Sequence, residues 1–155
     1  MKTLASLLFA FAAAAPAAVF ADASESQPRA LGAANDYDSG KKAIERKDWK
    51  AAIGSLDSAA KSDPKDADIQ NLLGYSYRKS GNLDMAFKHY AKALELNPGH
   101  KGAHEYVGEA YLMANKPDKA KEHLARLVQL CPQGCEERDD LTKAIAQHEK
   151  TKPAR

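Results

Sequence analysis

The chain has 155 residues, of which 23 are basic and 21 are acidic. This near balance of charge excludes a bulk electrostatic argument for a nucleic-acid or anionic-membrane partner. The length suits one domain, and a middle region dominated by Ala, Lys, Glu and Leu, with few β-branched runs, favours an all-α fold over a disordered chain.

The first 21 residues have the pattern of a secretory signal peptide. Lys2 precedes a long uncharged apolar run, and Val19 and Ala21 form the small-x-small arrangement that signal peptidase accepts. Pro16 and the alanine-rich composition favour a signal over a membrane anchor. We expect cleavage after Ala21, or after Ala23 with the same consequence, and hence an exported protein without a stable membrane anchor.

Residues 22–32, DASESQPRALG, come next. They lack hydrophobic periodicity and are rich in small and polar residues, so little apolar surface is available to fold them. We expect a flexible leader here.

Three residue types then recur with one shared period of 34 residues. A period that three residue types share in phase indicates an internal repeat. The recurring positions are the glycines Gly40, Gly74 and Gly108, the alanines Ala52, Ala86 and Ala120, and the prolines Pro64, Pro98 and Pro132.

Each period has the pattern of two helices joined by a tight turn. In the second period, two apolar stretches with helical spacing are separated by Gly81 and Asn82. Asn115 and, less favourably, Lys47 occupy the position of Gly81 in the other periods, where a positive φ is useful. Each proline follows a second helix and ends it. The small residues let the two helices approach closely, so a leucine at Gly74 would overpack their interface.

These features resemble the tetratricopeptide repeat, in which the glycine is followed by a tyrosine three residues later. Tyr77 and Tyr111 fit this pattern, whereas Ala43 departs from it, and an apolar residue follows each alanine by four (Leu56, Tyr90 and Leu124). The resemblance covers about 33 to 134. It implies a right-handed solenoid of three helix-turn-helix units, at 33–66, 67–100 and 101–134.

A narrower resemblance concerns the third unit and the residues directly after it. The stretch GAHEYVGEAYL with a CP…CEE ending resembles a group of small exported bacterial tetratricopeptide proteins. This resemblance implies a periplasmic location for the chain.

Cys131 and Cys135 lie in the stretch CPQGC after the third unit. In an oxidising compartment such a pair can close a small disulfide loop, which in the chain-entropy model stabilises the fold by roughly 2 kcal/mol. A redox-active pair is more usually spaced by two residues, so a structural cross-link is favoured over a catalytic dithiol.

Residues 135–150 are expected to form a terminal capping helix. Leu141, Ile145 and His148 fall on one face, with charged residues elsewhere. Residues 151–155 form a short tail.

The stretch GAHEYVGEAY, which holds His104, Glu105 and Glu109, raises the question of a metal or acid/base site. His100 is four residues before His104 but lies in a loop, and Gly108 replaces the second histidine of the HExxH zinc pattern. We expect His104 to fill a helix interface, with no metal, cofactor or catalytic residue in the chain.

The resemblance also implies a binding surface, because the first helices of tetratricopeptide units line a concave groove. It selects seven candidate residues, which are Tyr37, Lys41, Asn71, Tyr75, Arg78, Glu105 and Glu109. Domains of this family that clamp the carboxylates of chaperone tails place cations where this chain has Glu105 and Glu109. The reversed charge favours a partner segment that carries lysine or arginine.

The leading hypothesis is therefore a non-enzymatic interaction module of the bacterial cell envelope that binds a peptide or protein segment in this groove. A second hypothesis is a structural assembly subunit acting through its convex surface or its leader. A metal-binding protein or small enzyme is the least favoured, since no convergent set of ligands or of nucleophile and base is found.

Overall fold

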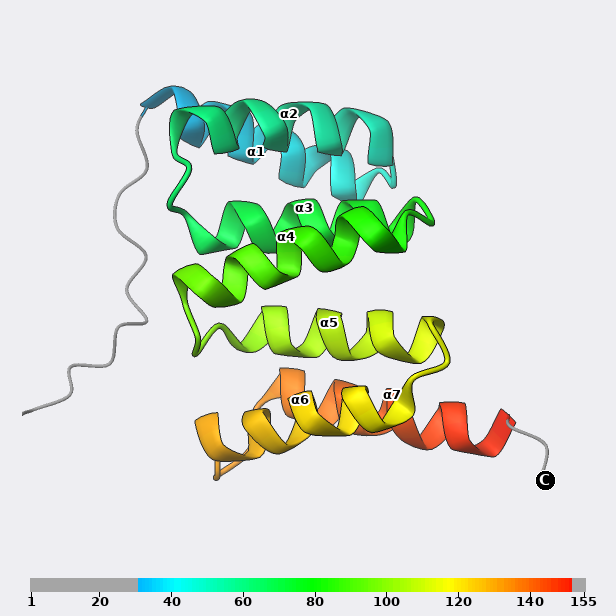
Figure 1. Cartoon of the computed structure of the whole chain (residues 1–155). Helices are drawn as coiled ribbons and strands as arrows, with labels where there is room; N and C mark the ends of the chain where they lie inside the picture. The colour runs from blue at the N-terminus through cyan, green and yellow to red at the C-terminus, as the bar shows by residue number, and fades with distance from the viewer. Residues whose placement is uncertain (1–30, 152–155) are drawn as a thin grey trace, which may run out of the picture.

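The computed structural model describes residues 31–151, which form seven α-helices and no strand (Figure 1). The predicted signal peptide and its cleavage near Ala21, most of the predicted leader, and residues 152–155 lie outside this described part. The helices are α1 (Leu31–Glu45), α2 (Trp49–Ser62), α3 (Ala67–Lys79), α4 (Leu83–Leu96), α5 (Lys101–Met113), α6 (Pro117–Leu130) and α7 (Glu136–Thr151).

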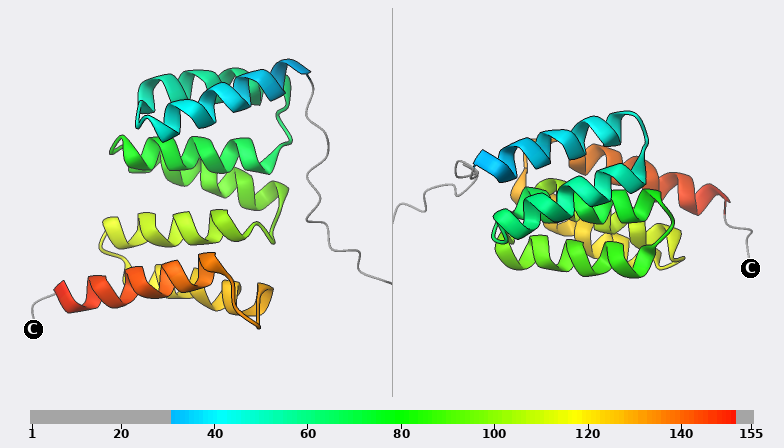
Figure 2. Two further views of the ribbon diagram at one scale, coloured as in Figure 1. Left: turned by 180° about the vertical axis from the view of Figure 1, so that it is seen from behind. Right: turned by 90° about the horizontal axis from the view of Figure 1, so that it is seen from above.

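The helices stack as antiparallel pairs, α1 with α2, α3 with α4 and α5 with α6, and α7 closes the far end (Figures 1 and 2). α1, α3, α5 and α7 form one layer, which faces the viewer in the left panel of Figure 2, and α2, α4 and α6 form the other. The prediction of an all-α solenoid is confirmed. None of the described helices is long and apolar enough to cross a membrane.

The turns within each pair adopt the backbone that the sequence predicts. Lys47, Gly81 and Asn115 have φ of 58°, 87° and 55°, so the left-handed conformation recurs at all three positions. The side chain of Asn82 then caps α4 by accepting a hydrogen bond from the Met85 amide at 3.1 Å. Pro64, Pro98 and Pro132 each follow the end of α2, α4 or α6, as expected.

The repeated glycines mark points where two helices touch. A Cβ placed on Gly74 would lie 2.6 Å from the Tyr90 ring on α4, and one on Gly40 would lie 2.6 Å from Leu56 on α2. The third glycine differs, because the nearest atoms to Gly108 belong to Leu141 of α7, at 2.7 Å, and not to α6. The repeated alanines are fully buried, at Ala52, Ala86 and Ala120.

Three hydrophobic clusters run along the solenoid and share residues at their borders. The first cluster centres on Leu56 and Leu73, the second on Tyr90 and Val107, and the third on Leu127 and Leu141. Tyr77 packs against both the first and the second cluster, and Tyr111 packs against both the second and the third. The tyrosines of the repeat pattern therefore join neighbouring parts of one core.

A disulfide joins Cys131 and Cys135 at the connection between α6 and α7, so the two cysteines are bonded to each other. Arg138 of α7 donates from Nη1 to the carbonyl oxygens of Cys131 and Pro132, each at 3.3 Å. These contacts fix the start of α7, and Leu141 and Ile145 then complete the third cluster.

Candidate functional site

The layer of α1, α3, α5 and α7 carries the candidate site, and we call it the odd-helix face. Its aromatic row consists of Trp49, which begins α2 at the border of this layer, Tyr75 on α3 and Tyr106 on α5. The ring centroids of Trp49 and Tyr75 are 6.2 Å apart, and those of Tyr75 and Tyr106 are 4.9 Å apart. All three rings are partly exposed, so they can contact a partner.

Arg78 joins α3 to α5 beneath this row. Its Nη2 lies 2.6 Å from Oε2 of Glu109, and its Nε donates to the Tyr90 hydroxyl at 3.3 Å. The guanidinium carbon is 5.3 Å from the centroid of Tyr75 and 5.5 Å from that of Tyr106, within cation–π range. The Arg78 side chain is only 7% exposed, and its contacts with Tyr90 and Glu109 link the second and third units.

Glu105 lies one turn before Glu109, where α5 meets α7. The pKa of its carboxyl is raised to about 8, chiefly by burial and then by the neighbouring carboxylates of Glu109, Asp140 and Glu137, against an opposing effect of Arg78. Within residues 31–151, Glu105 has no ion pair and no side-chain hydrogen bond, whereas Glu109 is paired with Arg78. Glu105 is therefore an uncompensated acid on this face.

The structure brings four of the seven predicted residues together, namely Tyr75, Arg78, Glu105 and Glu109. Tyr37 and Lys41 form a separate pair on α1, where Lys41 Nζ lies 5.7 Å from the Tyr37 ring centroid and Tyr37 also packs on the first cluster. Asn71 is 6% exposed, so its amide is not displayed on the surface.

Sequence reasoning missed four members of the site, which are Trp49, Tyr106, Glu137 and Asp140. Tyr106 follows Glu105 directly, and it has no aromatic counterpart in the other units, where Asp38 and Leu72 stand. The two acids of α7 belong to a helix outside the repeat. No periodic signal marks any of the four.

The contacts of His104 show how this histidine, a candidate metal ligand in the sequence, is held. It is 7% exposed, its Nε2 is 3.0 Å from the carbonyl oxygen of Pro98, and its Nδ1 is 2.9 Å from Nδ1 of His123 on α6. Since a carbonyl only accepts, neutral His104 carries its proton on Nε2 and accepts at Nδ1 from His123. Among residues 31–151, no group of three or more His, Cys, Asp and Glu could hold a metal ion.

The same contact recurs one unit earlier, where Nδ1 of His89 lies 2.9 Å from Oε1 of Gln70. Both pairs join the first and second helices of one unit at equivalent repeat positions. His104 therefore fills a helix interface, as expected from the sequence. His100 caps α5, since its Nδ1 accepts from the Ala103 amide at 3.2 Å.

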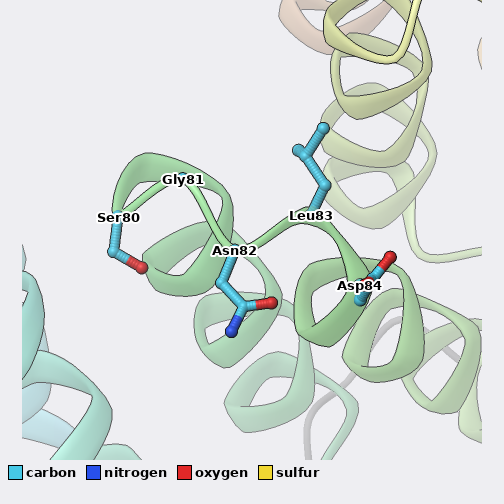
Figure 3. A pocket seen from close by; sticks show the side chains of 5 residues that line it. All are labelled: Ser80, Gly81, Asn82, Leu83 and Asp84. Atoms are coloured by element: carbon cyan, nitrogen blue, oxygen red, sulfur yellow. The ribbon is translucent and has the colours of Figure 1, made fainter.

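One shallow hollow lies away from this site, at the turn between α3 and α4 (Figure 3). Ser80 and Asn82 line it, but both side chains are engaged locally, with the Tyr77 carbonyl and the Met85 amide. Leu83 points away from these polar groups in Figure 3. The hollow has no set of converging polar groups that would bind a ligand.

Comparison with known protein families gives two matches. Residues 67–100 and residues 104–134 each match a tetratricopeptide repeat. Among curated proteins, the human Protein O-mannosyl-transferase TMTC3 is 29% identical over 86 residues, which is 56% of this chain and 9% of that protein. Its mouse counterpart is 28% identical over the same length. The chain thus spans less than a tenth of these relatives.

Solved structures share the fold at low sequence identity. The TPR2B domain of yeast Sti1, in complex with pHsp70, has a TM-score of 0.73 at 17% identity and covers 79% of this chain and 100% of its own. The first TPR of Spaghetti (RPAP3), bound to the HSP90 peptide SRMEEVD, has a TM-score of 0.67 at 22% identity and covers 77% and 94%. The second TPR domain of human RPAP3, with the HSP70 peptide SGPTIEEVD, has a TM-score of 0.68 at 19% identity and covers 78% and 98%.

Proposed function

We propose that this chain, a tetratricopeptide repeat protein, is an interaction module that binds an extended segment of another protein along its odd-helix face. The observation that carries the proposal is the aromatic row of Trp49, Tyr75 and Tyr106 beside the uncompensated Glu105. Tyrosine and tryptophan are favoured anchors at protein interfaces. Two solved domains of the same fold are complexes with short peptides, which supports this mode of binding.

The partner segment has a lysine or arginine where it passes α5. The peptides in those two solved domains are acidic, ending in EEVD. This chain instead places the acidic residues Glu105, Glu137 and Asp140 where α5 meets α7, and a basic segment complements them.

The proposal extends to location, with the protein working in the bacterial periplasm. The signal-like residues 1–21 support export. The Cys131–Cys135 disulfide supports an oxidising compartment. No catalytic step is part of the proposed function.

Affinity capture from a cell-envelope extract tests the proposal, with wild type compared with Glu105→Lys. Glu109 is left unchanged because its substitution would leave the buried Arg78 without its partner. The matched control is Glu95→Lys on α4, where Glu95 is 69% exposed and, among the described residues, forms an ion pair only with Lys92 of its own helix. Circular dichroism verifies that both variants remain helical.

We expect one or more proteins to be retained by wild type and by Glu95→Lys but lost from Glu105→Lys. Proteins retained equally by all three would contradict binding along the odd-helix face. They would favour assembly through the other layer or the leader.

A further inference from the structure

The near balance of charge over the whole chain conceals two edges of opposite sign. The turns inside the three units lie along one edge of the solenoid, at the right of Figure 1, and the connections between units lie along the other. The turn edge carries eight cations and four acids, over residues 41–50, 79–84 and 113–119. The connection edge carries four cations and seven acids, over residues 61–68, 97–101 and 131–140.

Most of the positive charge gathers at the first unit, where residues 41–50 end α1, form the turn and begin α2. Lys79 of α3 lies beside this segment, because its Nζ is 5.7 Å from the centroid of Tyr75, the ring that neighbours Trp49. We call the six cations gathered here the basic corner, which consists of Lys41, Lys42, Arg46, Lys47, Lys50 and Lys79.

The basic corner is not neutralised by the chain itself. All six side chains are exposed, and none forms an ion pair with another described residue. The segment has two acids, Glu45 and Asp48, and Asp48 accepts a hydrogen bond from the Ala51 amide at 3.0 Å to cap α2. Six cations therefore stand against two acids on an exposed surface.

Lys47 is kept at the tip of the turn although the backbone there disfavours lysine. Its φ is 58°, and the equivalent residues of the other units are Gly81 and Asn115, which are types that adopt this conformation more readily. Glycine or asparagine would serve the fold alone better. A residue held in a disfavoured conformation points to a role for its side chain.

Trp49 lies within the basic corner, and its ring is partly exposed. An indole combines an apolar ring with an N–H group, which suits the level of lipid headgroups. Five of the six cations are lysines, whose flexible ammonium groups suit a diffuse anionic surface better than the paired hydrogen bonds by which arginine reads nucleic acids. The corner also projects at the end of a helical hairpin, whereas peptide segments are commonly bound in grooves.

We propose that the basic corner docks this chain reversibly on the surface of a membrane that contains anionic phospholipids. The inference goes beyond the proposed function and does not depend on it. The cations lie over the lipid phosphates, Trp49 enters the headgroup layer, and the acidic connection edge is repelled and turned away from the membrane. α5 and α7 lie at the other end of the stack, so they stay open to a protein partner (Figure 1).

The experiment titrates the exported form of the chain with vesicles of equal parts phosphatidylcholine and phosphatidylglycerol, and with vesicles of phosphatidylcholine alone. Flotation measures binding, and fluorescence reports the basic corner directly, because Trp49 is the one tryptophan of the sequence. The test variant is Lys47→Asn, since asparagine removes the cation and fits the backbone, as Asn115 does. The matched control is Lys65→Asn, which removes an exposed cation from the connection edge.

We expect binding to the anionic vesicles alone, with the Trp49 emission shifted to shorter wavelength. Lys47→Asn should weaken this binding about fivefold, and the further change Lys42→Gln should bring the loss to about 25-fold, whereas Lys65→Asn should bind as wild type does. Circular dichroism verifies that each variant remains helical.

Three results would overturn the inference: no binding to anionic vesicles, equal binding to both kinds of vesicle, or equal losses from Lys47→Asn and Lys65→Asn. Binding that leaves the Trp49 emission unchanged would overturn it as well, because another surface would then face the membrane. An emission shift with polyglutamate or a DNA duplex, but not with vesicles, would assign the corner to an acidic polymer instead.

Discussion

A single side chain, Glu105, shows how this fold keeps an acid in an unfavourable place. Its pKa is about 8 in the folded chain against an ordinary value of 4.5, because of burial and then the three nearby carboxylates. Between pH 4.5 and pH 8, Glu105 holds a proton in the folded chain that it has lost in the unfolded chain. The stability that this proton contributes is complete below pH 4.5 and is lost as the pH rises through 8.

Glu105→Gln should therefore stabilise the chain more at pH 9 than at pH 5, because glutamine carries no charge at either pH. Urea unfolding of wild type and variant at both pH values measures this difference. The control is Glu95→Gln, which is expected to have the same effect at both. An equal effect of Glu105→Gln at pH 5 and pH 9 would contradict the environment described for Glu105.

The buried histidines have the opposite dependence on pH. Burial lowers the pKa of His89 and His104, and burial together with His104 lowers the pKa of His123 to about 4. The unfolded chain therefore binds more protons as the pH falls below the ordinary value of 6.5. The stability that depends on neutral His123 is complete above pH 6.5 and is lost toward pH 4.

His123→Gln should reduce this acid sensitivity, since a glutamine amide can donate to His104 Nδ1 but does not titrate. The measurement is the slope of unfolding free energy between pH 6.5 and pH 4. A slope as steep as in wild type would show that His123 does not contribute to it.

At the scale of helices, the glycine contacts determine how closely each pair packs. Gly74→Ala places a methyl group 2.6 Å from the Tyr90 ring and should destabilise the chain by about 1–3 kcal/mol. Gly54→Ala is the matched control, because a Cβ at Gly54 in α2 meets nothing within 4 Å. There the gain in helix propensity should stabilise by about 0.5–1 kcal/mol. Guanidinium unfolding of both variants tests the pair, and equal effects would contradict the contact.

The tie between α3 and α5 depends on the Arg78–Glu109 pair. Arg78→Leu leaves the Glu109 carboxylate, which is 28% exposed, without its cation. This change should lower the free energy of unfolding by about 3 kcal/mol. Adding Glu109→Gln removes that charge, so the double variant should be more stable than Arg78→Leu alone. Denaturant unfolding of the three proteins decides this. A double variant that is less stable than the single one would contradict the explanation.

The period of the sequence predicted the elements that repeat, and it could not predict what does not repeat. The turn positions of Lys47, Gly81 and Asn115 and the buried alanines follow from the period alone. Trp49 has Leu83 and Pro117 at its equivalent positions, so its place in the aromatic row left no periodic signal.

The contact of Gly108 with Leu141 could not be predicted from the repeat either, because it depends on how α7 lies across α5. The acids that face Glu105 come from the same helix. The candidate site was therefore predicted at Tyr75, Arg78, Glu105 and Glu109. It was missed at Trp49 and Tyr106, and where α7 completes it.

At the scale of the whole molecule, the three hydrophobic clusters lie in a row, and only the middle cluster has a neighbouring cluster on both sides. Tyr77 and Tyr111 are the residues shared between clusters, and each lies at the border of the second. In stacked repeats such as these, stability is close to a sum over units and their interfaces. Hydrogen exchange should therefore be slowest in α3 to α5 and faster in α1, and uniform protection across all seven helices would contradict this arrangement.

The contact between Gly108 and Leu141 also bears on how copies of this chain could assemble. α7 occupies the end of the array on which a further unit would stack, and it turns charged residues such as Glu136, Lys143 and Lys150 outward. Head-to-tail addition of a second molecule would have to displace this helix, so open-ended filaments are blocked at one end. Copies that associate through the remaining end, at α1 and α2, would form a closed two-fold pair.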